Sequence, residues 1–241
     1  MRQQINRPVK QSRASRKAAA PFRRRLVIMA KAPVAGRVKT RLARQVGVAE
    51  ACRFYRTASR TVLARLSRQP FWETIVAVDT VGDLAHPVWP RGVSRMHQGR
   101  GELGARMHKP MRTLPPGPVC VVGTDVPGIG AGDVRRAFRL LGNHDMAFGP
   151  AEDGGFWLVG ARRRPRVFYP YAGVRWSQST SLAQTLANLG DCRVAFTTRH
   201  HDVDDAGDLA RATATFGRRV RSGDHPAPPQ ENDCAVAAGR A

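Results

Sequence analysis

The chain has 241 residues, with 40 Lys or Arg against 18 Asp or Glu and a formal net charge of +22. This length suits one domain with a sizeable core. No apolar run approaches the roughly 20 residues that span a bilayer, and residues 1–25 lack the apolar segment of a secretory signal. The four cysteines are far apart and form no C-x-x-C pair. This spacing argues against a zinc site or a disulfide framework and favours a cytoplasmic protein.

Part of the positive charge is concentrated at the N-terminus. Residues 1–25 hold nine basic side chains and no acidic one, which leaves 31 basic and 18 acidic residues in the remainder. We interpret residues 1–25 as a disordered basic arm that makes non-specific contacts with anions. A dedicated nucleic-acid arm and an organelle-targeting segment are the alternatives. Residues 218–241, rich in Pro, Ala and charge, predict a disordered tail, so the predicted domain spans residues 26–217.

Apolar runs alternate with segments of helical periodicity from Leu26 onward. In chain order, the pattern predicts a strand at 26–30, a long amphipathic helix at 42–66, strands at 74–78 and 93–97, a helix at 103–112 interrupted by Pro110, a strand at 119–122, a helix at 134–141, strands at 146–148 and 156–159, a helix that Ser179 caps and Gly190 ends, and a strand at 194–196. This alternation predicts an α/β fold with a mostly parallel sheet covered on both faces. Ligands bind such sheets at the carboxyl ends of the strands, where loops 31–41, 123–127 and 149–155 should converge.

The loop after the first strand has the composition of an anion site. It carries four cations and a glycine ahead of a predicted helix start: Lys31, Gly36, Arg37, Lys39 and Arg41. Helix N-terminal amides and basic side chains both stabilise phosphate oxygens. The loop is no Walker motif, because the first glycine of that motif is missing. It predicts a site for a polyanion such as a nucleotide diphosphate, and the alternative is a basic surface loop.

Carboxylates follow two of the predicted strands. Asp125 comes just past the strand 119–122, where it could hold Mg²⁺ against a diphosphate. The alternative is an Asx-turn. Four carboxylates lie within residues 202–208, an excess over what helix capping needs. Asp204 is the best candidate for a second metal ligand, with Asp202 as its substitute, whereas the adjacent His200 and His201 are typical of a polar strand end.

Three further segments carry candidate ligand contacts. Asp153, ahead of a Gly-Gly turn, could bind acceptor hydroxyls or act as a general base, and the alternative is an ordinary hairpin turn. The Gly-rich segment 98–107 could let a nucleobase lie against the backbone, with one arginine near phosphate. Trp176 is either an aromatic wall of the site or a core residue. The candidate binding residues are Gly154 and Gly155 of the Gly-Gly turn, and Gln98, Gly101, Gly104 and Arg106 of the Gly-rich segment.

Taken together, these stretches resemble a bacterial family of glycosyltransferase-A-fold (GT-A) transferases, known as radical-SAM/selenodomain-associated transferases or arsenosugar-biosynthesis-type glycosyltransferases. The resemblance covers roughly residues 26–212. It rests on the opening K-x-P-x-x-G-x-x-K-T-R-L, residues 98–107, G-T-D-x-P, D-G-G-F-W-L-V-G and D-V-D-D-x-x-D-L. Lys39–Leu42 and residues 153–155 are also similar to parts of 2-phospholactate guanylyltransferase. The chain departs from both patterns, since it lacks the second Asp of a D-x-D motif and the G-G-x-G-x-R opening of nucleotidyltransferases.

The resemblance implies a three-layer nucleotide-diphospho-sugar transferase (GT-A) fold with a mostly parallel central sheet. It also implies a nucleotide sugar or nucleoside triphosphate as ligand, with Mg²⁺ or Mn²⁺. We therefore predict a Mg²⁺-dependent transferase that moves a glycosyl group from a nucleotide sugar to a small-molecule acceptor. The alternatives are nucleotidyl transfer to a phosphorylated small molecule and a non-catalytic basic nucleic-acid-binding protein. In the predicted site, Lys31, Arg37, Lys39 and Arg41 neutralise the diphosphate, Asp125 and Asp204 position the metal, and Asp153 orients or deprotonates the acceptor.

Overall fold

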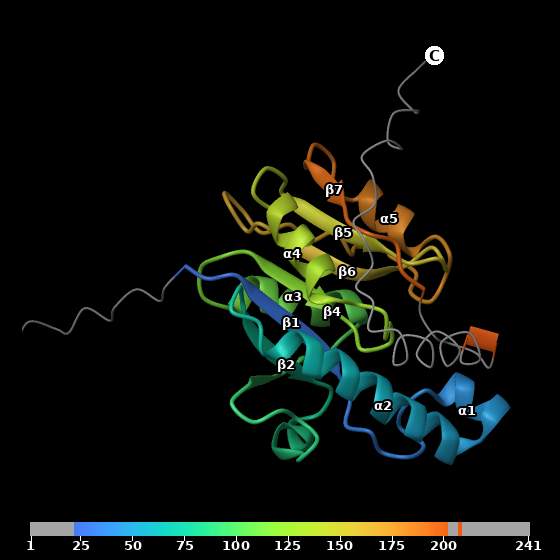
Figure 1. The fold of residues 1–241 in the computed structure, drawn as a ribbon. Coiled ribbons are helices and arrows are strands. Elements are labelled where there is room, and N and C mark those ends of the chain that lie inside the picture. Colours follow the sequence, from blue (N-terminus) through green and yellow to red (C-terminus); the bar gives the residue numbers. More distant parts are fainter. Residues whose placement is uncertain (1–21, 202–206, 209–241) are drawn as a thin grey trace, which may run out of the picture.

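A single seven-stranded sheet organises the part of the chain that the computed structural model describes, residues 22–201 and 207–208 (Figure 1). The strand order is β3-β2-β1-β4-β6-β5-β7. Only β6 runs antiparallel to its neighbours β4 and β5 within these residues, so the prediction of a mostly parallel sheet is confirmed. The strands are β1 Arg25–Ala30, β2 Glu73–Val78, β3 Ser94–His97, β4 Val119–Val122, β5 Met146–Pro150, β6 Phe156–Ala161 and β7 Val194–Phe196.

Helices cover both faces of this sheet and complete three layers. They are α1 Thr40–Val46, α2 Val48–Ser67, α3 Leu103–Thr113, α4 Ala131–Leu140 and α5 Ser181–Ala187, with a short 3₁₀ helix η1 at Val81–Ala85. Helices α2 and α4 pack their apolar residues into one core cluster, and α3 and α5 pack theirs into a second cluster. In Figure 1, α2 and α4 lie in front of the sheet and α3 lies behind it.

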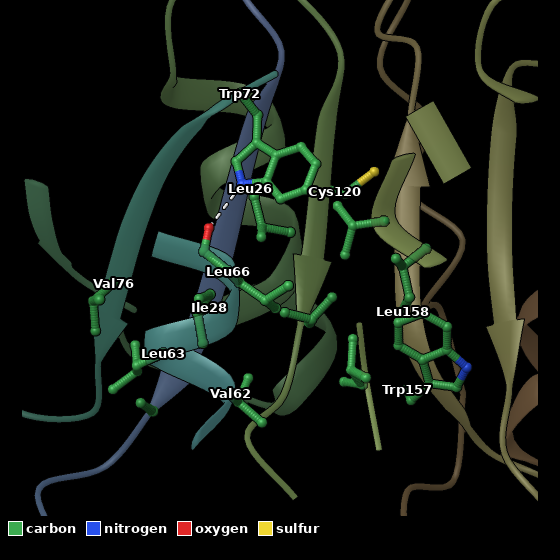
Figure 2. Close-up of a cluster of buried hydrophobic side chains, with 14 of the residues drawn as sticks. Leu26, Ile28, Val62, Leu63, Leu66, Trp72, Val76, Cys120, Trp157 and Leu158 are labelled. Atoms are coloured by element: carbon green, nitrogen blue, oxygen red, sulfur yellow. Dashed lines mark hydrogen bonds between the residues drawn. The ribbon is translucent and has the colours of Figure 1, made fainter. Parts of the chain in front are cut away.

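The two core clusters, one on each face of the sheet, explain why the central strands are continuous apolar runs. Ile28 of β1 and Leu63 of α2 are fully or almost fully buried, and Figure 2 shows them in the same cluster as Trp72. The indole N–H of Trp72 donates to the carbonyl of Leu66 over 3.1 Å, so the polar end of this buried ring is satisfied. A strand covered on both faces must be apolar at successive positions rather than at alternate ones.

Two predicted helices differ from the structure because of their special residues. The single helix predicted at 42–66 is two helices, α1 and α2, separated by Gly47 with a φ of 87°. Apolar spacing continues on both sides of the break, so periodicity does not reveal it. Helix α3 runs through Pro110 without interruption. Burial of Met107 and Met111 against the sheet stabilises α3 across the missing proline N–H.

The start of the last predicted helix also needs correction. Ser179 does not cap it, because α5 begins at Ser181 and its N-cap residue, Thr180, makes no side-chain capping bond. The Ser181 hydroxyl instead donates to backbone carbonyls of the preceding turn, that of Gln178 among them. The helix ends at Ala187, before the predicted stop at Gly190. Strand β1 begins at Arg25, one residue earlier than predicted, and the Arg25 guanidinium donates to Glu73 over 3.0 Å.

The predicted basic arm and tail lie almost entirely outside the described residues, as do Asp202 and Asp204. Among the helices within 22–201 and 207–208, none combines the length and the apolar character that crossing a membrane requires.

Candidate active site

A cavity of about 590 Å³ opens at the carboxyl ends of the central strands. Its lining includes residues 37–41 of the first loop, residues 123–126 after β4, and residues of the 151–156 turn between β5 and β6. The three loops that the sequence analysis placed together therefore converge. Helices α2 and α3 and the segment before α5 complete the wall.

Two carboxylates orient the cations of this cavity. Asp79 accepts from Arg106 at 3.2 Å and lies 3.9 Å from the Lys31 ammonium. Asp83 accepts from Arg37 at 3.1 Å. Neither carboxylate was among the site residues predicted from the sequence. A signal for Asp79 was present in the sequence, because this residue directly follows the apolar strand β2. Asp125 holds a similar position after β4, from which Gly123 and Thr124 separate it.

Lys39 is paired with the predicted metal ligand. The Lys39 ammonium lies 3.1 Å from Oδ1 of Asp125, and the lysine side chain is 8% exposed whereas that of Asp125 is 53% exposed. Lys39 also has a left-handed backbone conformation, with φ 46° and ψ 47°, at the N-cap of α1. Such a conformation is uncommon for a residue with a side chain and points to a constrained position. Arg41, the second residue of α1, is exposed and lines the cavity.

Tyr55 connects the first loop to the Asp125 loop. Its hydroxyl accepts the backbone N–H of Lys31 at 2.9 Å and the Thr124 hydroxyl at 3.2 Å, and it donates to the Lys31 carbonyl at 3.3 Å. Burial and the nearby charge of Asp125 raise the pKa of Tyr55 to about 12, so the phenol stays protonated at neutral pH. From the sequence, Tyr55 was predicted only to lie within the amphipathic helix at 42–66. Its phenol needs a polar partner when buried, and that was the available signal.

The Gln98 side chain connects β1 and β2 to Arg106 through hydrogen bonds. Its side chain is buried and lines the cavity. The amide donates to the carbonyls of Ala77 at 2.9 Å and Ala30 at 3.4 Å, at the ends of β2 and β1, while its oxygen accepts from Arg106 at 3.3 Å. Gln98 thus positions Arg106 beside the cavity.

Four of the predicted glycines do not line the cavity, and they instead permit close packing or a positive φ near it. A Cβ at Gly104 would lie 2.5 Å from the Cβ of Tyr171, so this position permits α3 to pack closely. A Cβ at Gly154 would lie 2.0 Å from the Ser179 carbonyl oxygen. Gly36 and Gly101 have positive φ angles in turns. None of these four lines the cavity, to which the segment 98–107 contributes Gln98, Leu103, Arg106 and Met107.

The wall formed by lining residues of the segments 151–157 and 176–181, the Asp153 wall, is acidic and aromatic. Asp153 is exposed, and its Oδ1 accepts the N–H of Gly155 at 2.8 Å, the hydrogen bond of an Asx-turn. Trp176 lines the cavity and also packs on Phe156 and Tyr171, with ring centroids 6.3 and 5.8 Å apart. Trp176 therefore both lines the cavity and belongs to an aromatic cluster. Among the described residues that line this wall, Asp153 alone is charged.

Of the two carboxylates among the described residues that line the cavity, that of Asp125 lies beside a cation of the first loop. Within 22–201 and 207–208, no group of three or more His, Cys, Asp or Glu side chains is placed to hold a metal. Mg²⁺ commonly binds proteins through one or two carboxylates and completes its shell with water and substrate phosphates. The half-exposed carboxylate of Asp125, facing a cationic cavity, fits this mode.

The two histidines pair with carboxylates instead of each other. His200 lies 3.1 Å from Asp133. His201 lies 3.0 Å from Glu152 and 2.8 Å from Asp208, so it connects the 151–156 turn to the chain after residue 206. Both histidines lie beyond β7, which ends at Phe196.

Comparisons with known proteins place this geometry in context. A family profile described as "Uncharacterized protein conserved in bacteria" (DUF2064) matches residues 62–178. No curated protein matches the chain. Among solved structures, the chain is similar to a protein of Desulfovibrio desulfuricans G20 proposed to be a nucleotide-diphospho-sugar transferase. The TM-score is 0.72 and the identity 26%, over 84% of this chain and 90% of that one.

More distant structures share the fold. A cytidylyltransferase from Leptospira borgpetersenii serovar Hardjo-bovis (strain JB197) has a TM-score of 0.56 and 13% identity, covering 82% of this chain and 88% of its own. CMP:2-keto-3-deoxy-manno-octonic acid synthetase complexed with CTP has a TM-score of 0.54 and 16% identity, covering 82% and 99%. The fold is that of the nucleotide-diphospho-sugar transferases and cytidylyltransferases, as predicted. The expectation of a transferase agrees with these relatives.

Proposed function

We propose that this protein is a Mg²⁺-dependent transferase that moves a glycosyl group from a nucleotide sugar to a small hydroxylated acceptor. The observation that carries the proposal is the division of the cavity into two chemically different walls. Five cations and the exposed carboxylate of Asp125 come from the first loop, α3 and the loop after β4 and form the cationic wall, whereas the Asp153 wall is aromatic and hydroxylated with one carboxylate, Asp153. A nucleotide diphosphate suits the cationic wall, and an uncharged acceptor with hydroxyl groups suits the Asp153 wall.

Each residue has a role that follows from its position. Lys31, Arg37 and Arg41 would contact the diphosphate oxygens and stabilise the negative charge that grows on the leaving phosphate. Asp125 would hold the metal, with Asp204 as the proposed second ligand. The metal would supply Lewis-acid stabilisation of the leaving group.

The acceptor would meet the donor beside Asp153. As the acceptor oxygen forms its bond to the anomeric carbon, the bond from that carbon to the phosphate oxygen breaks and its electron pair leaves with the nucleotide. The acceptor proton passes to the free carboxylate oxygen of Asp153, whose other oxygen is held by the Gly155 N–H. The Trp176 ring would cover the apolar face of the acceptor.

Nucleotidyl transfer is the second candidate, and the shared fold with a synthetase complexed with CTP favours it. In that reaction an acceptor phosphate displaces pyrophosphate from a nucleoside triphosphate. The cationic wall would have to accommodate both the triphosphate and the acceptor phosphate, because the lining of the Asp153 wall contains no cation among the described residues.

The experiment that tests the proposal is a product assay on the full chain. The protein is incubated with Mg²⁺, a panel of nucleotide sugars or nucleoside triphosphates, and neutral or phosphorylated acceptors. Acceptor-dependent release of nucleoside diphosphate supports glycosyl transfer, whereas acceptor-dependent release of pyrophosphate replaces it with nucleotidyl transfer. If no nucleotide raises the melting temperature and Asp125→Ala alters no ligand response, both candidates fail.

A pair of variants tests the role of Asp153. Asp153→Asn should lower kcat by about 10²-fold or more with little change in donor affinity, because it removes the proton acceptor and keeps the shape of the turn. Asp191→Asn, an exposed carboxylate outside the cavity lining, is the matched control and should retain full activity. Equal activity of the two variants would remove Asp153 from the mechanism.

A further inference from the structure

The pairing of Lys39 with Asp125 has a consequence for the order in which ligands bind. We propose that Lys39 occupies the metal-binding carboxylate until a polyphosphate arrives, and that the ammonium then transfers from Asp125 to the phosphate as the divalent cation takes its place. This inference rests on the proposed function, since it concerns the metal and phosphate ligands of the same cavity. It makes binding of metal and binding of nucleotide mutually dependent.

The geometry distinguishes Lys39 from the other cations of the cavity. Lys31 and Arg106 pair with Asp79, which does not line the cavity. Lys39 pairs with Asp125, which does line it and has its side chain 53% exposed. A metal ion entering the cavity therefore meets a carboxylate whose Oδ1 already has a cation 3.1 Å away.

Electrostatics then sets the dependence between the ligands. A divalent cation on Asp125 would lie close to the Lys39 ammonium, and like charges at such a separation repel each other strongly in a partly buried site. A polyphosphate removes the conflict, because its oxygens accept the ammonium and also coordinate the metal. The lysine has four methylene groups, so its ammonium can move while its backbone remains at the N-cap of α1.

The proposed exchange of Lys39 predicts that metal binding and phosphate binding strengthen each other. Phosphate should tighten metal binding, and metal should tighten phosphate binding by the same factor. Removing the ammonium should make the carboxylate available to metal in the absence of any phosphate. A lysine that served only to neutralise phosphate would leave metal binding unchanged when removed.

The test measures Mn²⁺ binding to the full chain by the electron paramagnetic resonance signal of the free ion, with no nucleotide present. Lys39→Met should bind Mn²⁺ about tenfold more tightly than the wild-type protein. Lys109→Met is the matched control, because Lys109 donates to the His97 carbonyl and does not line the cavity. It should bind Mn²⁺ as the wild type does. Adding Asp125→Asn to Lys39→Met should abolish the gain.

Unchanged or weaker Mn²⁺ binding by Lys39→Met would overturn the inference, as would a gain that survives Asp125→Asn. Lys39→Gln provides a second variant if the methionine disturbs folding, which circular dichroism would reveal. In a second measurement, the affinity for inorganic pyrophosphate should rise on adding Mn²⁺ by a larger factor in the wild type than in Lys39→Met. An equal factor also overturns the exchange. Neither measurement requires turnover, so the failure of this inference is distinguishable from failure of the transferase proposal.

Discussion

Tyr55→Phe should destabilise the protein because it removes one buried hydroxyl and keeps the ring. Two donors lose their acceptor, the Lys31 backbone N–H and the Thr124 hydroxyl, and the Thr124 residue is only 2% exposed. A buried polar group left without a partner costs about 1–3 kcal/mol. We expect a loss of about 2 kcal/mol in the free energy of unfolding, which is the middle of the range for one such group.

Urea unfolding at neutral pH measures this loss, with an unchanged dependence on denaturant as the criterion that only stability has changed. Tyr169→Phe is the control, since Tyr169 is 48% exposed, and it should alter stability by less than about 0.5 kcal/mol. Because the pKa of Tyr55 is raised to about 12, its hydroxyl keeps its proton from pH 6 to pH 9 and the loss should be the same at both. A difference between the two variants below about 0.5 kcal/mol would refute the assigned hydrogen bonds.

Two further variants test the packing and the charge contacts around the cavity. Gly104→Ala should destabilise the protein by about 1–3 kcal/mol, because the added Cβ would lie 2.5 Å from Tyr171, whereas Gly132→Ala in α4 meets nothing within 4 Å and should be neutral or stabilising in urea unfolding. Burial lowers the pKa of His201, but its hydrogen bonds with Asp208 and Glu152 outweigh burial and raise it overall. Its contribution to stability is therefore complete below its ordinary pKa of 6.5 and is lost as pH rises through the folded value. His201→Gln should cost more stability at pH 6 than at pH 9, and a cost that grew with pH would contradict these pairings.

The sheet was predictable from the sequence because burial on both faces leaves a direct trace in composition. Residues 119–122 are four successive apolar residues, and they form β4 with every side chain buried. The helices were less predictable. A positive φ at Gly47 separates two helices without altering their apolar spacing, and the buried face of α3 carries it through Pro110. In both cases a local conformation or a tertiary contact outweighs the periodic pattern.

The edge of the sheet that carries the site was predictable, but the pairing of its side chains was not. Loops that follow parallel strands must converge, so Lys31 and Asp125 could be placed together from the topology alone. The partner of Arg37 is 46 residues away in the sequence, and that of Arg106 is 27 residues away. No local pattern relates such positions. The hydrogen bonds of the Tyr55 hydroxyl were not predicted for the same reason, because its partners lie on two loops distant in the sequence.

These pairings change the electrostatic meaning of the basic loop. Five cations line the cavity, but Asp79, Asp83 and Asp125 pair with four of them, and Asp153 lines the same cavity. Five positive and four negative side chains leave a net charge of only +1 around the described part of the site. A polyphosphate carries several negative charges, so these side chains alone would leave it undercompensated. A divalent cation bound with the polyphosphate supplies the missing positive charge. The near balance of charge therefore favours a metal-bound nucleotide over a bare one as the ligand of this cavity.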